Sequence, residues 1–272
     1  PTYTLHAITI GSFHLGEADK ILTLFSSERG LVRAVAKGAR KPKAKMSGRS
    51  DVLNVNKLLL ATGRSLDIIT QAETIETFGA LRKDLVRLSF ALYYAELTQH
   101  FAQGVADESE IYFQFLTDSL RAQSQQKDDA AFLCLEFELQ LLQLLGYKPE
   151  LDYCVACREP LTDFSLAAFH YEQGGIVCER CFSGRARVVR EGGDETVAPD
   201  HSRHGTGSTH VTPMVWKRLI LASQVDIPEL DRVAETQQNV LRANQAARRI
   251  VQGYIEHRAG RRMKALDLIG QM

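Results

Sequence analysis

Residues 20–37 read KILTLFSSERGLVRAVAK, two runs of apolar and β-branched residues on either side of the turn Ser27-Glu28-Arg29-Gly30. This pattern predicts a β-hairpin with strands over Lys20–Ser26 and Leu31–Lys37. Segments of similar composition flank it at Tyr3–Ile10, Val52–Ala61 and Ser65–Glu73. Five short strands within about 75 residues indicate a small barrel, with the OB-fold as the leading candidate.

The connection between the third and fourth predicted strands, Gly38–Asp51, is too long and too charged for a tight turn. The stretch Arg29–Ser50 holds eight lysines and arginines and no acidic residue. We expect an open loop, kept so by Pro42 and Gly48, whose cations neutralise phosphates beside the barrel; a solvated basic loop is the alternative. The residues expected to bind DNA are Arg33, Lys37, Arg40, Lys41, Lys43, Lys45 and Arg49.

Aromatic residues that could stack on bases are few in this block. The candidates are Tyr3, Phe13, Phe25 and Phe78, of which Phe25 is expected in the core.

The chain carries no net charge, because its 272 residues include 33 basic and 33 acidic ones. The distribution is uneven: basic and acidic residues number 11 and 7 in residues 1–80, 6 and 11 in 81–150, 9 and 13 in 151–239, and 7 and 2 in 240–272. Two basic ends therefore flank an acidic middle, so the zero sum does not argue against a nucleic-acid partner. The average composition argues against collagen-like, disordered and disulfide-framework proteins.

The hydrophobic period becomes helical after residue 80. We expect helices from Ala80 to about Phe101, from Ser109 with Ile111, Phe115, Leu116 and Leu120 facing inward, from Asp128 to Leu145, from Pro213 to about Gln224, and from about Thr236 onward. None of these is a membrane span, and the first ten residues do not resemble a signal peptide. We therefore expect a cytoplasmic protein without a membrane partner.

Two CxxC pairs, Cys154-Val155-Ala156-Cys157 and Cys178-Glu179-Arg180-Cys181, are separated by 20 residues. The strand-like segment Ser165–Tyr171 and the turn Gln173-Gly174-Gly175 lie between them. Two cysteine pairs around a hairpin indicate a zinc ribbon, and four thiolates leave no open position for catalysis. We expect one structural Zn²⁺ per chain, held by Cys154, Cys157, Cys178 and Cys181. Cys134 is expected to be a buried hydrophobe.

These patterns predict an α+β multidomain protein with an N-terminal OB-fold barrel over 1–78 and a helical domain over 79–150 and 212–272. The zinc ribbon over 151–184 is inserted, and a flexible polar loop follows over 185–211. The histidines at 201, 204 and 210 are expected to be solvated in that loop. The chain has no P-loop, HExxH, GxSxG or DxD-type carboxylate pair, so we expect no enzymatic activity.

The resemblance to a known family rests on four stretches. They are Gly16-Glu17-Ala18-Asp19-Lys20-Ile21-Leu22-Thr23 followed by Gly30, Ala36-Lys37-Gly38-Ala39-Arg40, Gly63-Arg64-Ser65-Leu66, and the cysteine pairs. Together with the order of domains, they resemble the RecO family of bacterial recombination mediators. The resemblance covers nearly the whole chain, but the polar stretch Gly184–Thr212 exceeds what it leads us to expect.

The resemblance implies a non-catalytic protein of DNA repair and recombination in the bacterial cytoplasm, associated with the nucleoid. Such proteins bind single- and double-stranded DNA, anneal complementary strands without ATP and, with RecR and sometimes RecF, load RecA on single-stranded DNA coated with SSB. The residues alone leave two alternatives: a zinc-ribbon adaptor that binds only protein, and a metal-dependent nuclease.

Overall fold

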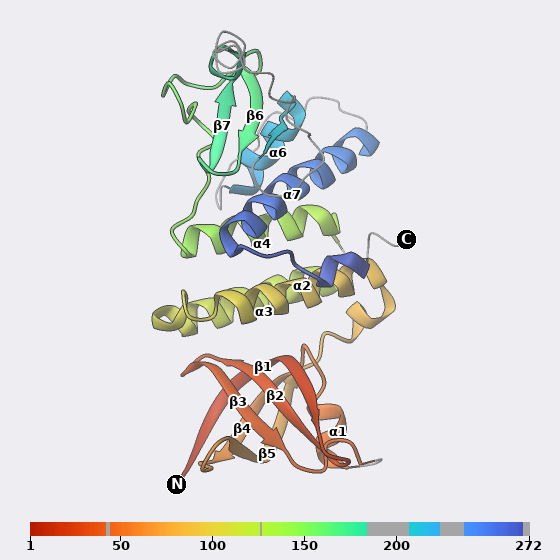
Figure 1. The fold of residues 1–272 in the computed structure, drawn as a ribbon. Helices are drawn as coiled ribbons and strands as arrows, with labels where there is room; N and C mark the ends of the chain where they lie inside the picture. The colour runs from red at the N-terminus through yellow and green to blue at the C-terminus, as the bar shows by residue number, and fades with distance from the viewer. Residues whose placement is uncertain (42–43, 126, 184–206, 224–236, 269–272) are drawn as a thin grey trace. The chain divides into compact units, whose positions relative to one another are not determined.

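The structure is a computed structural model that describes residues 1–41, 44–125, 127–183, 207–223 and 237–268 (Figure 1). The chain divides into two compact units. Unit 1 comprises Pro1–Ala130 and Met263–Met272, and unit 2 comprises Ala131–Arg262. The finer domain boundaries expected from the sequence stay a prediction.

Unit 1 begins with a closed five-stranded barrel, the OB-fold. Its strands are β1 (Thr2–Leu15), β2 (Asp19–Ser26), β3 (Gly30–Ala36), β4 (Val55–Ala61) and β5 (Asp67–Glu76), in the order β1-β2-β3-β5-β4. Neighbouring strands are antiparallel except β3 and β5, whose parallel pairing closes the barrel. β1 runs past Ile10, the end of the predicted strand, because a register shift between Thr9 and Gly11 lets it continue beside β2.

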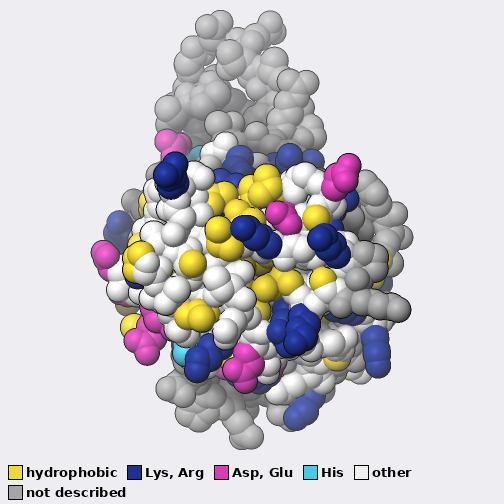
Figure 2. Space-filling model, turned by 90° about the horizontal axis from the view of Figure 1, so that it is seen from below, with side chains coloured by type: hydrophobic (Ala, Val, Ile, Leu, Met, Phe, Trp, Pro, Cys, Tyr) yellow, Lys and Arg dark blue, Asp and Glu magenta, His cyan; other side chains and the backbone are white. Residues whose placement is uncertain are grey.

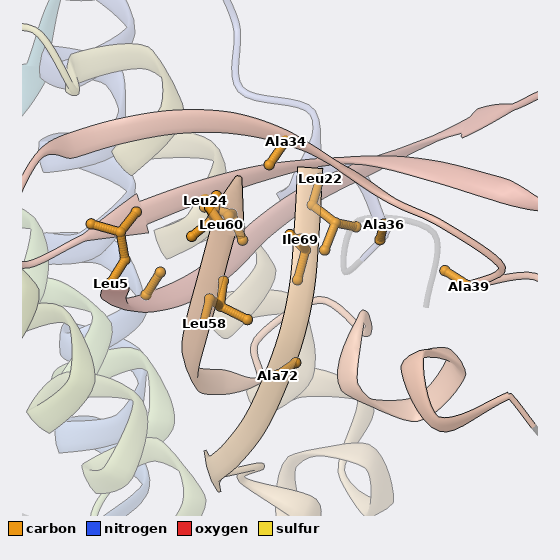
Figure 3. Packing of buried hydrophobic residues seen from close by; sticks show 11 residues of the cluster. Leu5, Leu22, Leu24, Ala34, Ala36, Ala39, Leu58, Leu60, Ile69 and Ala72 are labelled. Carbon is orange, nitrogen blue, oxygen red and sulfur yellow. The ribbon is translucent and has the colours of Figure 1, made fainter. Parts of the chain in front are cut away.

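Small and medium-sized apolar side chains fill the barrel. Leucines from β1, β2 and β4 point toward one another (Figure 3). Alanines and Ile69 complete this core, and the partly buried Tyr3, Val32 and Met46 pack against it. The cluster is Leu5, Ala7, Leu22, Leu24, Ala34, Ala36, Ala39, Leu58, Leu60, Ile69 and Ala72. Because alternate residues of each strand point inward, the residues between them face outward from the barrel.

Two helices of unit 1, α2 (Leu85–Phe101) and α3 (Ser109–Gln125), pack against the barrel (Figure 1). Phe25 is fully buried and packs edge-on against Tyr112, with ring centroids 5.1 Å apart. The Tyr112 hydroxyl lies 2.9 Å from the Thr98 hydroxyl of α2. Burial raises the pKa of Tyr112 well above its usual value, so the phenol stays protonated.

Three details of these helices differ from the sequence predictions. The segment after residue 78 begins as a 3-10 helix, η1 (Gly79–Lys83), and α2 starts only after Asp84, whose side chain accepts the N–H of Arg87. A second 3-10 turn, η2 (Ala106–Glu108), precedes α3. Ile111 is 61% exposed, so its predicted inward orientation is wrong; Tyr112 takes the inward position instead.

In its described residues, unit 2 combines a three-stranded sheet with three longer helices and a short helical segment at 179–183. The longer helices are α4 (Ala130–Leu144), α6 (Pro213–Ser223) and α7 (Gln237–Ala259). The Arg218 side chain of α6 donates to Asn244 of α7 at 2.6 Å and lies over the Phe132 ring of α4. Cys134 of α4 is fully buried, as predicted.

The sheet has the order β7-β6-β8, from β6 (Leu166–His170), β7 (Gly175–Cys178) and β8 (Ser208–His210). β6 and β7 form the predicted hairpin. The prediction of a flexible loop over 185–211 is wrong for Ser208–His210, since these residues pair with β6. His210 thus lies in a strand, whereas 201 and 204 fall outside the described residues.

The ribbon sheet also packs on α7: Tyr254 contacts Phe169 edge-on, with ring centroids 5.4 Å apart. Among the helices that the structure describes, none is long and apolar enough to cross a membrane.

Candidate metal centre and nucleic-acid interface

The two cysteine pairs meet in space. The Sγ atoms of Cys154, Cys157, Cys178 and Cys181 lie within 4.8 Å of one another, and those of Cys157 and Cys178 are 3.8 Å apart. In a tetrahedral zinc site with bonds of about 2.3 Å, sulfur atoms are about 3.8 Å apart. The four cysteines therefore fit a single metal ion.

Backbone hydrogen bonds hold the two cysteine pairs in turns and favour the thiolate form that binds a cation. The first pair sits in a turn closed by the N–H of Arg158, which donates to the Cys154 carbonyl at 2.8 Å. The second pair spans the end of β7 and the helical residues 179–183. The N–H of Cys178 donates to the Cys154 sulfur at 3.3 Å. A thiolate accepts such bonds better than a thiol does.

The thiols of the cluster differ in acidity. Burial opposes ionisation of Cys154, but N–H groups of Cys178, Cys157 and Ala156 outweigh it and lower its pKa to about 6. The N–H of Glu159, followed by the Arg180 guanidinium, lowers the pKa of Cys157. Burial and the neighbouring thiols raise the pKa of Cys178 and Cys181. Four adjacent thiolates repel one another, and a divalent cation would relieve that repulsion.

The residues predicted to bind DNA lie on and beside β3. Arg33 lies on β3 and Lys37 directly follows it, whereas Arg40 and Lys41 lie in the next turn. Lys45 and Arg49 lie on the short helix α1 (Lys45–Arg49). The prediction of an open loop over Gly38–Asp51 is therefore wrong for Lys45–Arg49, the five residues of α1, which include Gly48. Lys43 falls outside the described residues.

One face of the barrel combines apolar and basic side chains. Strand pairing places Phe13, Ile21, Val35 and Ile68 in one row across β1, β2, β3 and β5. Arg33 and Lys37 flank Val35 on the same side of the chain, since all three alternate with the core residues Ala34 and Ala36. We call these six residues, Phe13, Ile21, Arg33, Val35, Lys37 and Ile68, the outer barrel face.

The outer barrel face is accessible to a ligand. Phe13 is 52% exposed, and both cations are exposed. Neither Arg33 nor Lys37 makes an ion pair with any residue that the structure describes. The underside of the barrel, seen in Figure 2, also carries lysine and arginine side chains among hydrophobic ones.

The other candidate aromatic residues are less available. Phe25 is in the core as predicted, and Phe78 is only 5% exposed, so it is no stacking surface. Tyr3 is covered by the Arg29 guanidinium, 3.9 Å from the ring centroid, and its hydroxyl bonds to Asp67. The outward positions Ile21, Val35 and Ile68 were not singled out in the sequence, although strand alternation marks them.

A set of hydrogen bonds ties the basic segment to the β1–β2 turn. The Asp19 carboxylate accepts the N–H of Gly38 at 2.7 Å. The N–H of Arg40 donates to Ala18 at 2.9 Å, and its guanidinium donates to Gly16 at 2.6 Å. We call Gly16, Ala18, Asp19, Gly38 and Arg40 the clasp. It joins two of the stretches on which the family resemblance rests.

Replacing Asp19 with alanine tests the clasp. Loss of the acceptor leaves the Gly38 N–H without its bond, and we expect the barrel to lose about 1–2 kcal/mol of unfolding free energy. We also expect several-fold weaker binding of single-stranded DNA in fluorescence anisotropy, because Lys37 and Arg40 lose their fixed positions. Removing an acidic residue would by itself strengthen binding. Tighter binding by Asp19→Ala would therefore contradict the positioning role, and Asp19→Asn, which retains an acceptor, is the control.

Comparison with known proteins agrees with this architecture. The family model for the N-terminal part of recombination protein O matches residues 2–78, and the model for its C-terminal part matches residues 82–192. The first match covers the barrel, and the second includes α2, α3, α4 and all four cysteines.

Individual relatives are named DNA repair protein RecO. A DNA repair protein RecO of Gloeobacter violaceus is 39% identical over 183 residues, covering 67% of this chain and 69% of the relative. One from Nostoc sp. is 29% identical over 286 aligned positions, which cover 98% of this chain and 95% of the relative. One from Pelotomaculum thermopropionicum is 38% identical over 187 residues, covering 69% and 71%. The chain belongs to the RecO family of DNA repair proteins.

Proposed function

We propose that this chain is a non-catalytic recombination mediator that acts on single- and double-stranded DNA. In this role it anneals complementary strands and, with RecR and indirectly RecF, helps to load RecA on single strands coated with SSB. The partner proteins come from the family resemblance. The proposed location is the bacterial cytoplasm, near the nucleoid.

The observation that carries the DNA-binding part of this proposal is the outer barrel face. Its apolar row offers bases a surface for stacking, and Arg33 and Lys37 lie where a backbone running beside that row would place phosphates. Lys41, Lys45 and Arg49 extend the positive charge beyond β3, and none has an ion pair within the described ranges.

Annealing follows from the same chemistry. Two complementary strands repel each other through their phosphates, and cations on one protein surface lower that repulsion. Bases that stack loosely on apolar side chains remain able to exchange their contacts for pairing with a second strand. Because base pairing supplies the free energy, this step requires neither nucleotide hydrolysis nor a catalytic residue.

We also propose that the four cysteines hold one structural Zn²⁺. The ion would join the turn at Cys154 to the end of β7, while the cysteine side chains satisfy all four of its positions. Its role would be to fix the ribbon, and no reaction step is assigned to it.

The salt dependence of binding tests the electrostatic part of the proposal. If about four phosphates are neutralised, the logarithm of the affinity for single-stranded DNA should fall against the logarithm of salt with a slope near −3. Lys37→Ala should reduce the magnitude of that slope by about 0.7. Fluorescence anisotropy at several salt concentrations measures both, and an affinity independent of salt would refute the assignment.

The alternatives give different outcomes in the same preparation. Annealing of complementary oligonucleotides, with and without SSB, is expected for a mediator. Magnesium-dependent cleavage of the labelled strand would identify a nuclease instead. Failure to anneal together with retention of SSB on the immobilised chain would favour the protein-binding adaptor.

A further inference from the structure

A polar pocket in unit 2 lies beside the first cysteine pair. It has a volume of about 430 Å³, and its lining includes Tyr147, Lys148, Glu150, Arg158, Tyr254 and Arg258. These six residues come from three segments: the residues after α4, the turn of the first cysteine pair and the last turns of α7. The β6–β7 turn adds Gln173 and Gly174 to the lining. None of these residues belongs to the outer barrel face.

The pocket carries an excess of positive charge. Lys148, Arg158 and Arg258 are exposed and form no ion pair among the residues that the structure describes. Glu150 is the one acid among the described lining residues, and it accepts the N–H groups of Asp152 and Tyr153 at 3.0 and 3.2 Å. Even if the C-terminal ends of α4 and α7 each contribute about half a negative charge, about one positive charge remains.

Arg158 has an unusual backbone conformation for a residue other than glycine. Arg158 has φ +62°, a left-handed conformation that only two other non-glycine residues of the described chain adopt. Glycine would adopt this turn without steric cost, whereas an arginine incurs one. The turn of the first cysteine pair accounts for this conformation, because the Arg158 N–H closes it by donating to the Cys154 carbonyl at 2.8 Å. The guanidinium itself makes no ion pair with a described residue and is exposed at the pocket.

An aromatic side chain lies beside these cations. Tyr147 is 43% exposed, and the Arg258 guanidinium lies 5.4 Å from its ring centroid and 5.0 Å from that of Tyr254. A single-stranded nucleic acid uses both features, because a base stacks on the ring while its phosphate contacts the cations. An acidic peptide would use the ring only if it also carried an apolar or aromatic side chain, whereas every nucleotide offers both a base and a phosphate.

We propose that this pocket is a second site for single-stranded nucleic acid, in which Lys148, Arg158 and Arg258 contact a phosphate and Tyr147 stacks on a base. The inference rests on the proposed function of the chain as a DNA-binding protein. It adds a binding site in unit 2 to the outer barrel face of unit 1. Two sites on one chain would let the protein hold two strands, or two parts of one strand.

Affinity measurements on pocket variants test the proposal, with a labelled thymidine oligonucleotide of about 35 nucleotides, enough for two sites of up to ~16 each. Arg158→Gly should weaken binding about 5- to 10-fold and reduce the magnitude of the salt slope by about 0.7. Its melting temperature should equal or exceed that of the wild type, since the backbone strain is relieved. Tyr147→Ala should weaken binding about 5- to 100-fold, and Tyr147→Phe should restore it.

Arg242→Ala is the matched control, because Arg242 is exposed on the same helix at ~24 Å from Arg258 along its axis. It should bind like the wild type. If Arg158→Gly and Tyr147→Ala also bind the oligonucleotide as tightly as the wild type does, while substitutions on the outer barrel face abolish binding, the pocket proposal is wrong and the proposed function stands. If the wild type binds no oligonucleotide, both are wrong. If the pocket variants lose affinity only for an acidic peptide with a free carboxyl terminus, the pocket is a protein-binding site.

Discussion

Cys154→Ala is expected to abolish metal binding and unfold the ribbon of unit 2. Cys154 is fully buried, its sulfur accepts the N–H of Cys178, and it is one of four ligands in the proposed site. A structural zinc contributes about 10–16 kcal/mol to the folding of small zinc domains at neutral pH. Entire domains are stable by only about 5–15 kcal/mol, so the ribbon should not remain folded without the ion.

Metal analysis of the purified chain should give one zinc for the wild type and none for Cys154→Ala. Hydrogen exchange resolved along the sequence should then reveal loss of protection in β6 and β7, with the barrel strands still protected. Cys134→Ala is the control: this cysteine is buried on α4, outside the cluster, so the variant should retain its zinc. Its stability should fall by only about 1 kcal/mol. A wild type without metal, or a Cys154 variant that retains it, would disprove the assignment.

Reversing the charges of Arg33 and Lys37 together, as Arg33→Glu and Lys37→Glu, is expected to weaken single-stranded DNA binding by about 100-fold or more at low salt. Both cations are replaced by groups that repel phosphates beside the apolar row of the outer barrel face. Annealing should slow in parallel. Stability should change by less than about 0.5 kcal/mol, because both side chains are exposed and make no ion pair with described residues.

The matched control is the double variant Arg82→Glu and Lys83→Glu, which changes the net charge by the same amount. These two residues are exposed at the end of η1, within the same unit but outside the outer barrel face. Anisotropy and annealing assays on both double variants separate a local site from a general charge effect. Equal losses would mean that only total charge matters, and unchanged binding by the Arg33/Lys37 variant would remove the face from the site.

The strands could be predicted from the sequence because alternation is a local signal. The five segments agree with the barrel strands, apart from their ends. Helix α1 was not predicted, because its five residues, which include Gly48, form no apolar stripe and come shortly after Pro42. The short strand β8 also carries little signal of its own, since it exists only through pairing with β6.

The orientation of a helix is harder to predict than its presence. Ile111 and Tyr112 are neighbours, and either could face inward by hydrophobicity alone. Contacts with Phe25 of the barrel and Thr98 of α2 select Tyr112. Such contacts join residues far apart in the chain, which a periodicity argument does not include.

The candidate sites also combine features that the sequence predicts with features that only the structure shows. Cysteine spacing was sufficient to group the four thiols, because metal geometry restricts that spacing. The clasp between Asp19 and Gly38 and the position of Arg158 in the pocket required three-dimensional structure. Charge counts do not distinguish Arg158 from the other exposed arginines; its place in the pocket lining does.

The return of the chain to unit 1 affects the order in which the protein is completed on the ribosome. The segment η3 (Ala265–Leu268) packs on α2, and the N–H groups of Lys264 and Ala265 donate to the Glu96 carboxylate at 3.0 and 2.8 Å. All of unit 2 is synthesised between these two partners. The barrel strands can pair early, but Glu96 acquires these donors only after the ribbon and α7 have emerged. Unit 1 is therefore the first to begin folding and the last to be finished.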